Sequence, residues 1–178
     1  MRRRLRIWTW PNALSVVRLP LAVAFPLARS VSVRVTLLAL AAAADFLDGQ
    51  IARRYDQSSR VGEVLDPVVD KVFVGTALVT FLVEGRLGLV QTAVLLARDV
   101  YCVLGWLVLM SWEDPPRVKA RPPGKVVTVL QLLAMVLLLL APGAVNAVVL
   151  VVVPAGAWAI VDYTRVALRS LRQRGQAS

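Results

Sequence analysis

The sequence predicts an all-α integral membrane protein with six transmembrane helices, preceded by a short interfacial helix. Two observations support this fold class. Hydrophobic residues make up 58% of the 178 residues, whereas a soluble domain is nearer half apolar. The apolar residues also gather into six runs of roughly 20 residues, the length a helix needs to cross the hydrocarbon core. Because no repeat, soluble domain or long linker interrupts these runs, we expect residues 1–178 to form a single membrane domain.

The elements follow in order along the chain. Residues 1–11 carry four arginines and two tryptophans, a composition typical of a basic helix at the membrane interface. Six spans come next, separated by short segments in which charged residues, proline or glycine interrupt the apolar pattern. We expect the spans at residues 12–29, 34–54, 66–83, 87–110, 124–141 and 144–164.

The positive charges predict an orientation for the six spans. Sixteen of the 21 lysines and arginines would lie on one side of the membrane, and only Arg29, Arg34 and Arg86 on the other. Basic loops are retained in the cytoplasm. We therefore expect both termini and the segment from Asp45 to Asp70 to face the cytoplasm, with the protein in the cytoplasmic membrane. The formal charge of +10 then indicates an anionic bilayer surface as partner rather than nucleic acid.

The residue inventory excludes several chemistries. The chain has no histidine and a single cysteine, Cys102. Histidine-dependent hydrolases, zinc–histidine centres and intrachain disulfides are therefore excluded. Acid–base or metal chemistry must fall to carboxylates and lysines.

Carboxylates cluster in the second half of the second span and at the start of the third. Asp45 and Asp48 share one helical face, and Asp66 and Asp70 share another. The short connection makes the two helices antiparallel neighbours, so the four carboxylates are expected to converge. Such a cluster needs compensating cations, and oxygen ligands without histidine favour Mg²⁺ or Mn²⁺. Four acids suit two divalent cations, a site that serves phosphoryl displacement.

Small and basic residues accompany these acids. Gly49 and Ala52 leave room beside the helix, and Gly62 allows a tight loop or a close phosphate approach. Arg53 can pair with phosphate oxygens. Each residue taken singly also has a structural interpretation, because acids at the ends of spans are often solvated and Asp–Arg pairs can be structural. Taken together, ionisable groups at this membrane depth indicate function.

The pattern D-x2-D-G-x2-A-R-x8-G-x3-D-x3-D resembles the signature of the CDP-alcohol phosphotransferase family. The segments "PNALSVVRLP", "LDPVVDK", "LLARD" and "GKVVT" are similar to the branch containing phosphatidylglycerophosphate synthases and cardiolipin synthases. All eight fixed positions of the signature are present: Asp45, Asp48, Gly49, Ala52, Arg53, Gly62, Asp66 and Asp70.

The resemblance implies six transmembrane helices around a cytoplasm-facing cavity, usually in a homodimer. It implies that Asp70 is the general base, which deprotonates an acceptor hydroxyl that attacks the β-phosphate of CDP-diacylglycerol and releases CMP. The implied ligands of the two divalent cations are Asp45, Asp48, Asp66 and Asp70. The implied contacts of the CDP group are Asp45, Gly49, Ala52, Arg53 and Gly62.

The acceptor is less well defined by the sequence. Many phosphatidylglycerophosphate synthases have a second lysine where this chain has Val127, which favours phosphatidylglycerol as acceptor and hence cardiolipin synthesis. Remaining cationic residues still favour glycerol 3-phosphate, our leading prediction. Structural alternatives are an interfacial helix with a snorkelling Arg18, an Arg98–Asp99 pair, and basic loop residues that only orient the protein. The candidate acceptor-binding residues are Asn12, Arg18, Arg98, Arg121 and Lys125.

Two rival interpretations remain. A small cation-coupled transporter would have inverted repeats and acids near the membrane midplane, but this chain has no evident repeat and its acids lie at one end of the spans. A catalytically inactive family member with a structural role would have lost signature aspartates, and none is lost.

Overall fold

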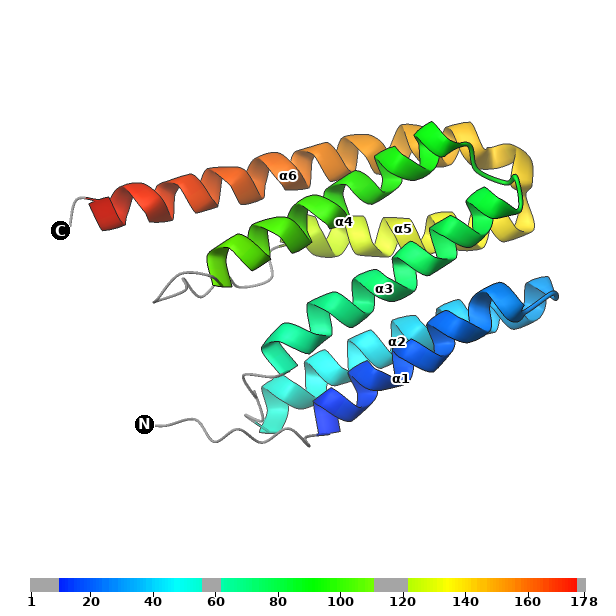
Figure 1. Ribbon diagram of the computed structural model, residues 1–178, viewed down its shortest axis with the longest axis horizontal. Coiled ribbons are helices and arrows are strands. Elements are labelled where there is room, and N and C mark those ends of the chain that lie inside the picture. The colour runs from blue at the N-terminus through cyan, green and yellow to red at the C-terminus, as the bar shows by residue number, and fades with distance from the viewer. Residues whose placement is uncertain (1–9, 56–61, 111–121, 176–178) are drawn as a thin grey trace. The chain divides into compact units, whose positions relative to one another are not determined.

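The computed structural model describes residues 10–55, 62–110 and 122–175, and describes side chains at 16–47, 68–105, 107–108, 124 and 126–168. Within these ranges the secondary structure is entirely helical (Figure 1). The helices are α1 (Trp10–Leu27), α2 (Val31–Tyr55), α3 (Gly62–Val83), α4 (Leu89–Met110), α5 (Pro122–Leu140), the 3₁₀ turn η1 (Pro142–Ala144) and α6 (Val145–Gly175).

Each predicted span corresponds to one helix. The boundaries agree within four residues except at the last helix, which continues to Gly175 rather than ending at residue 164. The added segment is rich in Leu, Ala, Arg and Gln, which are good helix formers, so α6 extends beyond its apolar part. The predicted interfacial helix over 1–11 lies outside the described residues, apart from Trp10 and Pro11, which begin α1.

One described helix has the length and composition of a membrane span. Residues Pro142–Leu168 form a 27-residue stretch in which an 18-residue window has a mean hydropathy of 2.2, and only 22% of that window is buried. This window is therefore mostly exposed, whereas the core helix of a soluble protein is mostly buried. Two shorter apolar helical stretches occur at Val16–Leu27 and Val126–Leu140. Crossing of the membrane by six helices stays a prediction.

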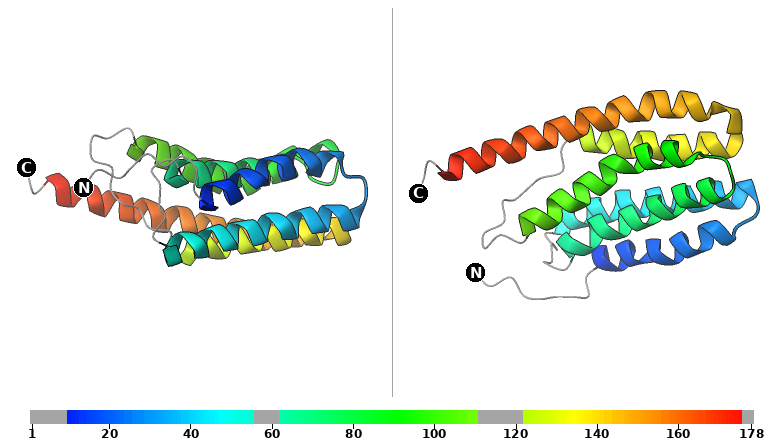
Figure 2. Two further views of the ribbon diagram at one scale, coloured as in Figure 1. Left: turned by 90° about the horizontal axis from the view of Figure 1, so that it is seen from below. Right: turned by 45° about the horizontal axis from the view of Figure 1, so that its top comes forward.

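The helices divide into two compact units. The first contains α1, α2 and α3, and the second contains α4, most of α5 and all of α6. In the first unit α1 packs against both α2 and α3 (Figure 2). This places the aspartates of α2 and α3 on helices that share α1 as a neighbour.

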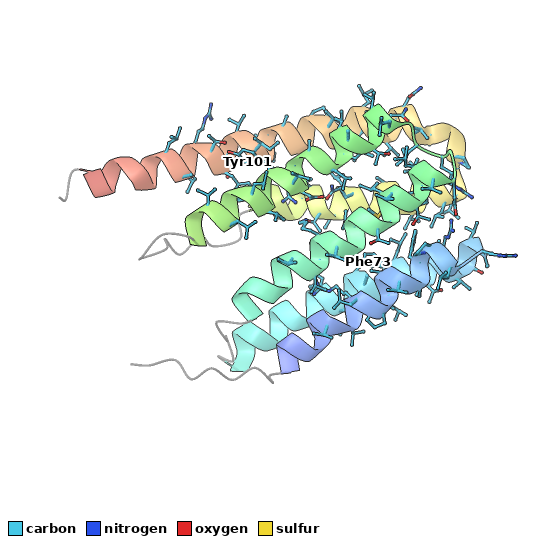
Figure 3. All side chains as sticks on the ribbon, viewed as in Figure 1. Phe73 and Tyr101 are labelled. Carbon is cyan, nitrogen blue, oxygen red and sulfur yellow. The ribbon has the colours of Figure 1, made fainter. Side chains whose placement is uncertain are left out.

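An aromatic cluster fixes α1 against α3 in the first unit. The fully buried ring of Phe25 meets Phe73 edge-on, with ring centroids 6.1 Å apart, and Phe81 in the same way at 5.8 Å. Edge-to-face pairs stabilise packing beyond the apolar area they bury. Figure 3 labels Phe73 on α3. The register of α1 along α3 therefore depends on these rings.

A glycine ends α3. Gly85 adopts φ +70°, a left-handed conformation that glycine takes without a steric penalty. Its N–H bonds to the carbonyl of Leu82 at 3.0 Å, and the N–H of Arg86 bonds to the carbonyl of Phe81 at 2.8 Å. This pair of bonds defines a Schellman cap, and it positions Glu84 and Arg86 on either side of Gly85.

Polar contacts join the helices of the second unit. The hydroxyl of Tyr101 on α4, labelled in Figure 3, lies 2.6 Å from the hydroxyl of Thr164 on α6. The side-chain N–H of Gln131 on α5 donates to the carbonyl of Leu95 on α4 at 3.1 Å. Buried polar groups need such partners, so these bonds specify which helix faces pack together.

Candidate functional site

A buried arginine joins two of the signature carboxylates. The Nη1 atom of Arg18 on α1 lies 3.3 Å from Oδ1 of Asp45 on α2 and 3.7 Å from Oδ1 of Asp70 on α3. The two carboxylate oxygens are therefore no farther apart than the sum of these distances. Three helices thus bring one cation and two acids together, as the sequence predicted for the acids but not for Arg18.

Exposure differs sharply within this group. The side chain of Arg18 is 1% exposed, whereas that of Asp70 is 21% and that of Asp45 is 52% exposed. The guanidinium lies beneath the carboxylates and leaves their outer edges accessible. Lys71 adds a second cation, with Nζ 3.2 Å from Oδ2 of Asp70. The carboxylates are held from inside the unit and remain open to a ligand from outside.

The other signature residues lie on the same two helices. Asp48, Gly49, Ala52 and Arg53 belong to α2, and Gly62 and Asp66 belong to α3, but their side chains lie outside the described ones. Among the described side chains, no three acids, cysteines or histidines come together as metal ligands. The convergence of all four aspartates therefore stays a prediction.

The donor set near Arg18 fits a hard divalent cation. Asp48 lies about one helical turn beyond Asp45, and Asp66 about one turn before Asp70. The four acids exceed the two cations Arg18 and Lys71 by a formal charge of −2. Accessible carboxylate oxygens with excess negative charge are the ligands that Mg²⁺ and Mn²⁺ prefer. By charge and by ligand type, the four aspartates therefore suit divalent metal ions.

Arg98 forms a separate buried network in the second unit. Its Nη1 donates to Oδ1 of Asp99 at 2.7 Å, and its Nη2 donates to the carbonyl of Gly124 at 3.0 Å. The other oxygen of Asp99 accepts from Gln131 at 2.7 Å. Arg98 and Asp99 are 7% and 4% exposed. Among the nitrogens of Arg98, only Nε lacks a hydrogen-bond partner. To bind Nη1 or Nη2, an acceptor substrate would therefore have to compete with Asp99 or the Gly124 carbonyl.

Gly124 permits a close approach between α5 and its neighbours. A Cβ atom at this position would collide with the hydroxyl of Tyr163 on α6 and would lie 2.9 Å from Nη2 of Arg98. Any larger residue would displace one of these groups. Gly124 therefore fixes the start of α5, immediately before the predicted acceptor ligand Lys125.

The remaining acceptor candidates are less well defined. Asn12 belongs to α1 and Lys125 to α5, with side chains outside the described ones, and Arg121 lies outside the described residues.

Gln131 and Gly124 were not identified from the sequence. Gln131 carried a usable signal, because an amide within the apolar stretch Val126–Leu140 requires a polar partner. Gly124 carried none, since a close helix approach leaves no spacing pattern.

Fold and site together define a class: helical proteins with an apolar helix of membrane-spanning length and an accessible pair of carboxylates over a buried arginine. The family model described as CDP-alcohol phosphatidyltransferase matches residues 8–161. The chain therefore belongs to the CDP-alcohol phosphatidyltransferase family, as the eight-residue signature predicted.

Individual relatives carry two different names. The chain is 33% identical to the CDP-diacylglycerol--glycerol-3-phosphate 3-phosphatidyltransferase of Pseudomonas fluorescens over 93% of each chain. It is 38% identical to the protein of that name from Aquifex aeolicus, over 60% of this chain and 62% of the relative, which is less than two thirds of that protein. It is 34% identical to the cardiolipin synthase (CMP-forming) of Streptomyces coelicolor, over 78% of this chain and 68% of the relative.

Proposed function

We propose that this protein is a phospholipid-synthesising enzyme that transfers the phosphatidyl group of CDP-diacylglycerol to an alcohol and releases CMP. The observation that carries this proposal is the convergence of Asp45 and Asp70 over Arg18. It supplies accessible carboxylates at the positions where the family signature requires them. The family match over residues 8–161 and the names of the relatives support the same reaction.

Asp70 is the proposed general base. It accepts the proton of the acceptor hydroxyl, the acceptor oxygen bonds to the β-phosphorus of CDP-diacylglycerol, and the bond from that phosphorus to the oxygen of CMP breaks. Ion pairs with Arg18 and Lys71 orient the Asp70 carboxylate. A base held within reach of the hydroxyl contributes through its position as well as its basicity. Arg53 is proposed to bind the phosphates of the CDP group.

We further propose a requirement for two divalent cations, Mg²⁺ or Mn²⁺. Asp45, Asp48, Asp66 and Asp70 would hold them. Bound there, these ions would supply positive charge that offsets the charge on the attacking and leaving oxygens. The excess of acids over cations in this part of α2 and α3 supports the requirement.

Glycerol 3-phosphate is the proposed acceptor. Support comes from the relative that aligns over 93% of both chains and carries glycerol 3-phosphate in its name, and from the cationic candidates Arg98, Arg121 and Lys125. One observation favours the second candidate, phosphatidylglycerol, which would make the protein a cardiolipin synthase. Arg98 already uses two nitrogens within its own network, and this reduces the charge available for a dianionic phosphate.

The proposed setting is the cytoplasmic membrane, with six spans, both termini and the active site on the cytoplasmic side, and two copies forming a homodimer. The apolar helix at Pro142–Leu168 supports a membrane location, and the asymmetry of basic residues supports the orientation. Cysteines introduced at Ser59 and Ser32 test it by labelling. Ser59 should react from the cytoplasm and Ser32 from outside, and the reverse pattern would contradict the orientation.

The deciding experiment is an acceptor panel. Purified protein is incubated with CDP-diacylglycerol and Mg²⁺, and with glycerol 3-phosphate or phosphatidylglycerol, and lipid products are identified by mass spectrometry. We expect phosphatidylglycerophosphate and CMP from the first acceptor. Cardiolipin formed from the second acceptor alone would replace the assignment by its alternative. No CMP release with either acceptor or with other alcohols, at any divalent metal, would reject the proposed function.

A further inference from the structure

Three arginines and one glutamate surround a depression at the end of the first unit remote from Asp45 and Asp70. Its volume is about 590 Å³. Glu84 is 14 residues beyond Asp70 in sequence, which corresponds to about 21 Å along a helix. The depression is therefore distinct from the carboxylate site. Its lining residues are Pro26, Leu27, Arg29, Arg34, Glu84 and Arg86.

Arg34 is fixed in this depression by several contacts. Its Nη1 donates to Oε2 of Glu84 at 2.7 Å, its Nη2 donates to the other oxygen, and its Nε donates to the carbonyl of Ala28 at 2.7 Å. The guanidinium also lies 5.4 Å from the ring centroid of Phe25. Arg34 is thus a buried, oriented cation that ties the start of α2 to the end of α3.

Glu84 is shared between two arginines. Nε of Arg86 lies 3.2 Å from the same Oε2 atom that accepts from Arg34. The Schellman cap at Gly85 sets the backbone on which Glu84 and Arg86 are carried. The two cations are therefore held near one another by a shared carboxylate.

The lining residues carry an excess of positive charge. Three arginines face one glutamate, a formal charge of +2 within the depression, and the Arg29 side chain is exposed. Arg29, Arg34 and Arg86 are also the three arginines that the charge asymmetry assigns to the sparsely charged side of the membrane. Basic residues there oppose the usual orientation preference, and among the lining residues Glu84 offsets only one of the three positive charges.

We propose that this depression binds a phosphate group, carried by an anionic phospholipid head group or by free phosphate. Arg29 and Arg86 would contact the phosphate oxygens, and Arg34, already paired with Glu84, would contribute positive charge from below. Guanidinium groups suit phosphate because their planar donors bind two oxygens at once. Pro26 and Leu27 line the same depression and give it an apolar side that a lipid could also contact.

The test compares Arg29→Gln with Arg165→Gln. Arg29 lines the depression, whereas Arg165 is an exposed arginine on α6 in the second unit, so the two variants lose the same charge at different places. Retention of short-chain phosphatidylglycerol by the detergent-purified protein is measured by native mass spectrometry, with diacylglycerol as the lipid that lacks phosphate. Binding of inorganic phosphate is measured by calorimetry.

We expect phosphatidylglycerol to bind and diacylglycerol not to bind. Arg29→Gln should weaken the phosphate-dependent binding roughly tenfold, as expected for loss of one charge-assisted contact, and Arg29→Glu should weaken it further. Arg165→Gln should match the wild type.

Weakened binding of phosphatidylglycerol alone identifies a lipid head group, and weakened binding of inorganic phosphate identifies the free anion. Equal binding by wild type and both Arg29 variants, or no binding of either probe to the wild type, would overturn the proposal. Because phosphatidylglycerol is also the alternative acceptor, only the difference between Arg29→Gln and Arg165→Gln, and not binding by itself, is assigned to the depression.

Discussion

Nη1 of Arg18 lies 3.3 Å from Oδ1 of Asp45, and this contact joins a cation whose side chain is 1% exposed to a carboxylate that is half exposed. Arg18 comes from α1, whereas the signature residues come from α2 and α3. The first helix therefore takes part in the acidic site by supplying a permanent positive charge beneath it. Arg18 holds two acids close together that would otherwise repel each other.

Replacement of Arg18 tests this role. Arg18→Gln should lower the free energy of unfolding of the metal-free protein by about 1–2 kcal/mol, a value reduced for the exposure of the carboxylates. Mg²⁺ should recover part of the loss, since a bound cation would offset the same acids. Thermal unfolding with and without Mg²⁺ measures both effects. Arg18→Lys, which keeps the charge, should lose less, and equal losses for the two variants would contradict an electrostatic role.

Asp70→Asn should separate turnover from binding. Loss of the proposed proton acceptor should reduce kcat by roughly 10²–10⁴-fold, while the affinity for CDP-diacylglycerol changes little. Steady-state kinetics and a lipid-binding assay measure the two quantities. Glu84→Gln removes an equal charge at the other end of the unit and should leave kcat near the wild-type value. A raised KM with unchanged kcat would make Asp70 a binding group instead.

The Arg34–Glu84 pair predicts a pH dependence of stability. Hydrogen bonding to Arg34 lowers the pKa of Glu84 below its ordinary value of 4.5, and the nearby charges of Arg34 and Arg86 lower it further. A depressed folded-state pKa means that the pair stabilises the protein above pH 4.5, and that this contribution is lost as the pH falls through the folded-state pKa.

Glu84→Gln tests that dependence. At pH 7 the variant should unfold about 1 kcal/mol more easily than the wild type, the upper range for an ion pair of this accessibility. The difference should shrink as the solution becomes more acidic than the folded-state pKa. Thermal unfolding across pH 3–7 is the measurement. Arg34→Gln and the double variant complete a double-mutant cycle for the ion pair. If the difference in unfolding free energy between the wild type and Glu84→Gln is the same at all pH values, the ion pair is not its cause.

Gly124→Ala should disrupt the start of α5. The added methyl group would meet Tyr163 and Arg98, and such overpacking costs about 1–3 kcal/mol. Gly105→Ala is the matched control, because no atom lies within 4 Å of a Cβ built there on α4, and alanine should stabilise a helix at that position by about 0.5–1 kcal/mol. Chemical denaturation measures both. Tyr163→Phe should relieve part of the Gly124→Ala defect, and failure of that rescue would place the clash elsewhere.

The sequence predicted the helices well because each apolar run is bounded by charged residues, proline or glycine. It predicted that Asp45 and Asp70 come together because helical spacing relates residues within one helix and a short loop makes α2 and α3 neighbours. It did not predict the contact of Arg18 with those acids, since no local periodicity connects residues 27 and 52 positions apart on different helices. The family and its reaction were predicted from eight residues at fixed spacings, a pattern that is more specific than any single contact.

The side chain of Arg98 shows the limit of such reasoning. Its sequence context suggested either a partner in Asp99 or an acceptor phosphate, and the structure gives it Asp99 and Gly124 as neighbours. The second contact depends on the approach of α5 to α4, which is a property of tertiary packing. The acceptor therefore cannot be deduced from the number of arginines alone.

The packing between α4 and α5 should be visible in the infrared frequency of the Leu95 carbonyl. As a residue within α4 it accepts the helical bond from the N–H four residues later, and it also accepts from Gln131. A second donor weakens the carbon–oxygen double bond, so this carbonyl should vibrate at a lower frequency than its neighbours in the helix. An isotope label at Leu95 would thus report, through its infrared band, whether α5 is docked against α4 in detergent, in a bilayer or during turnover.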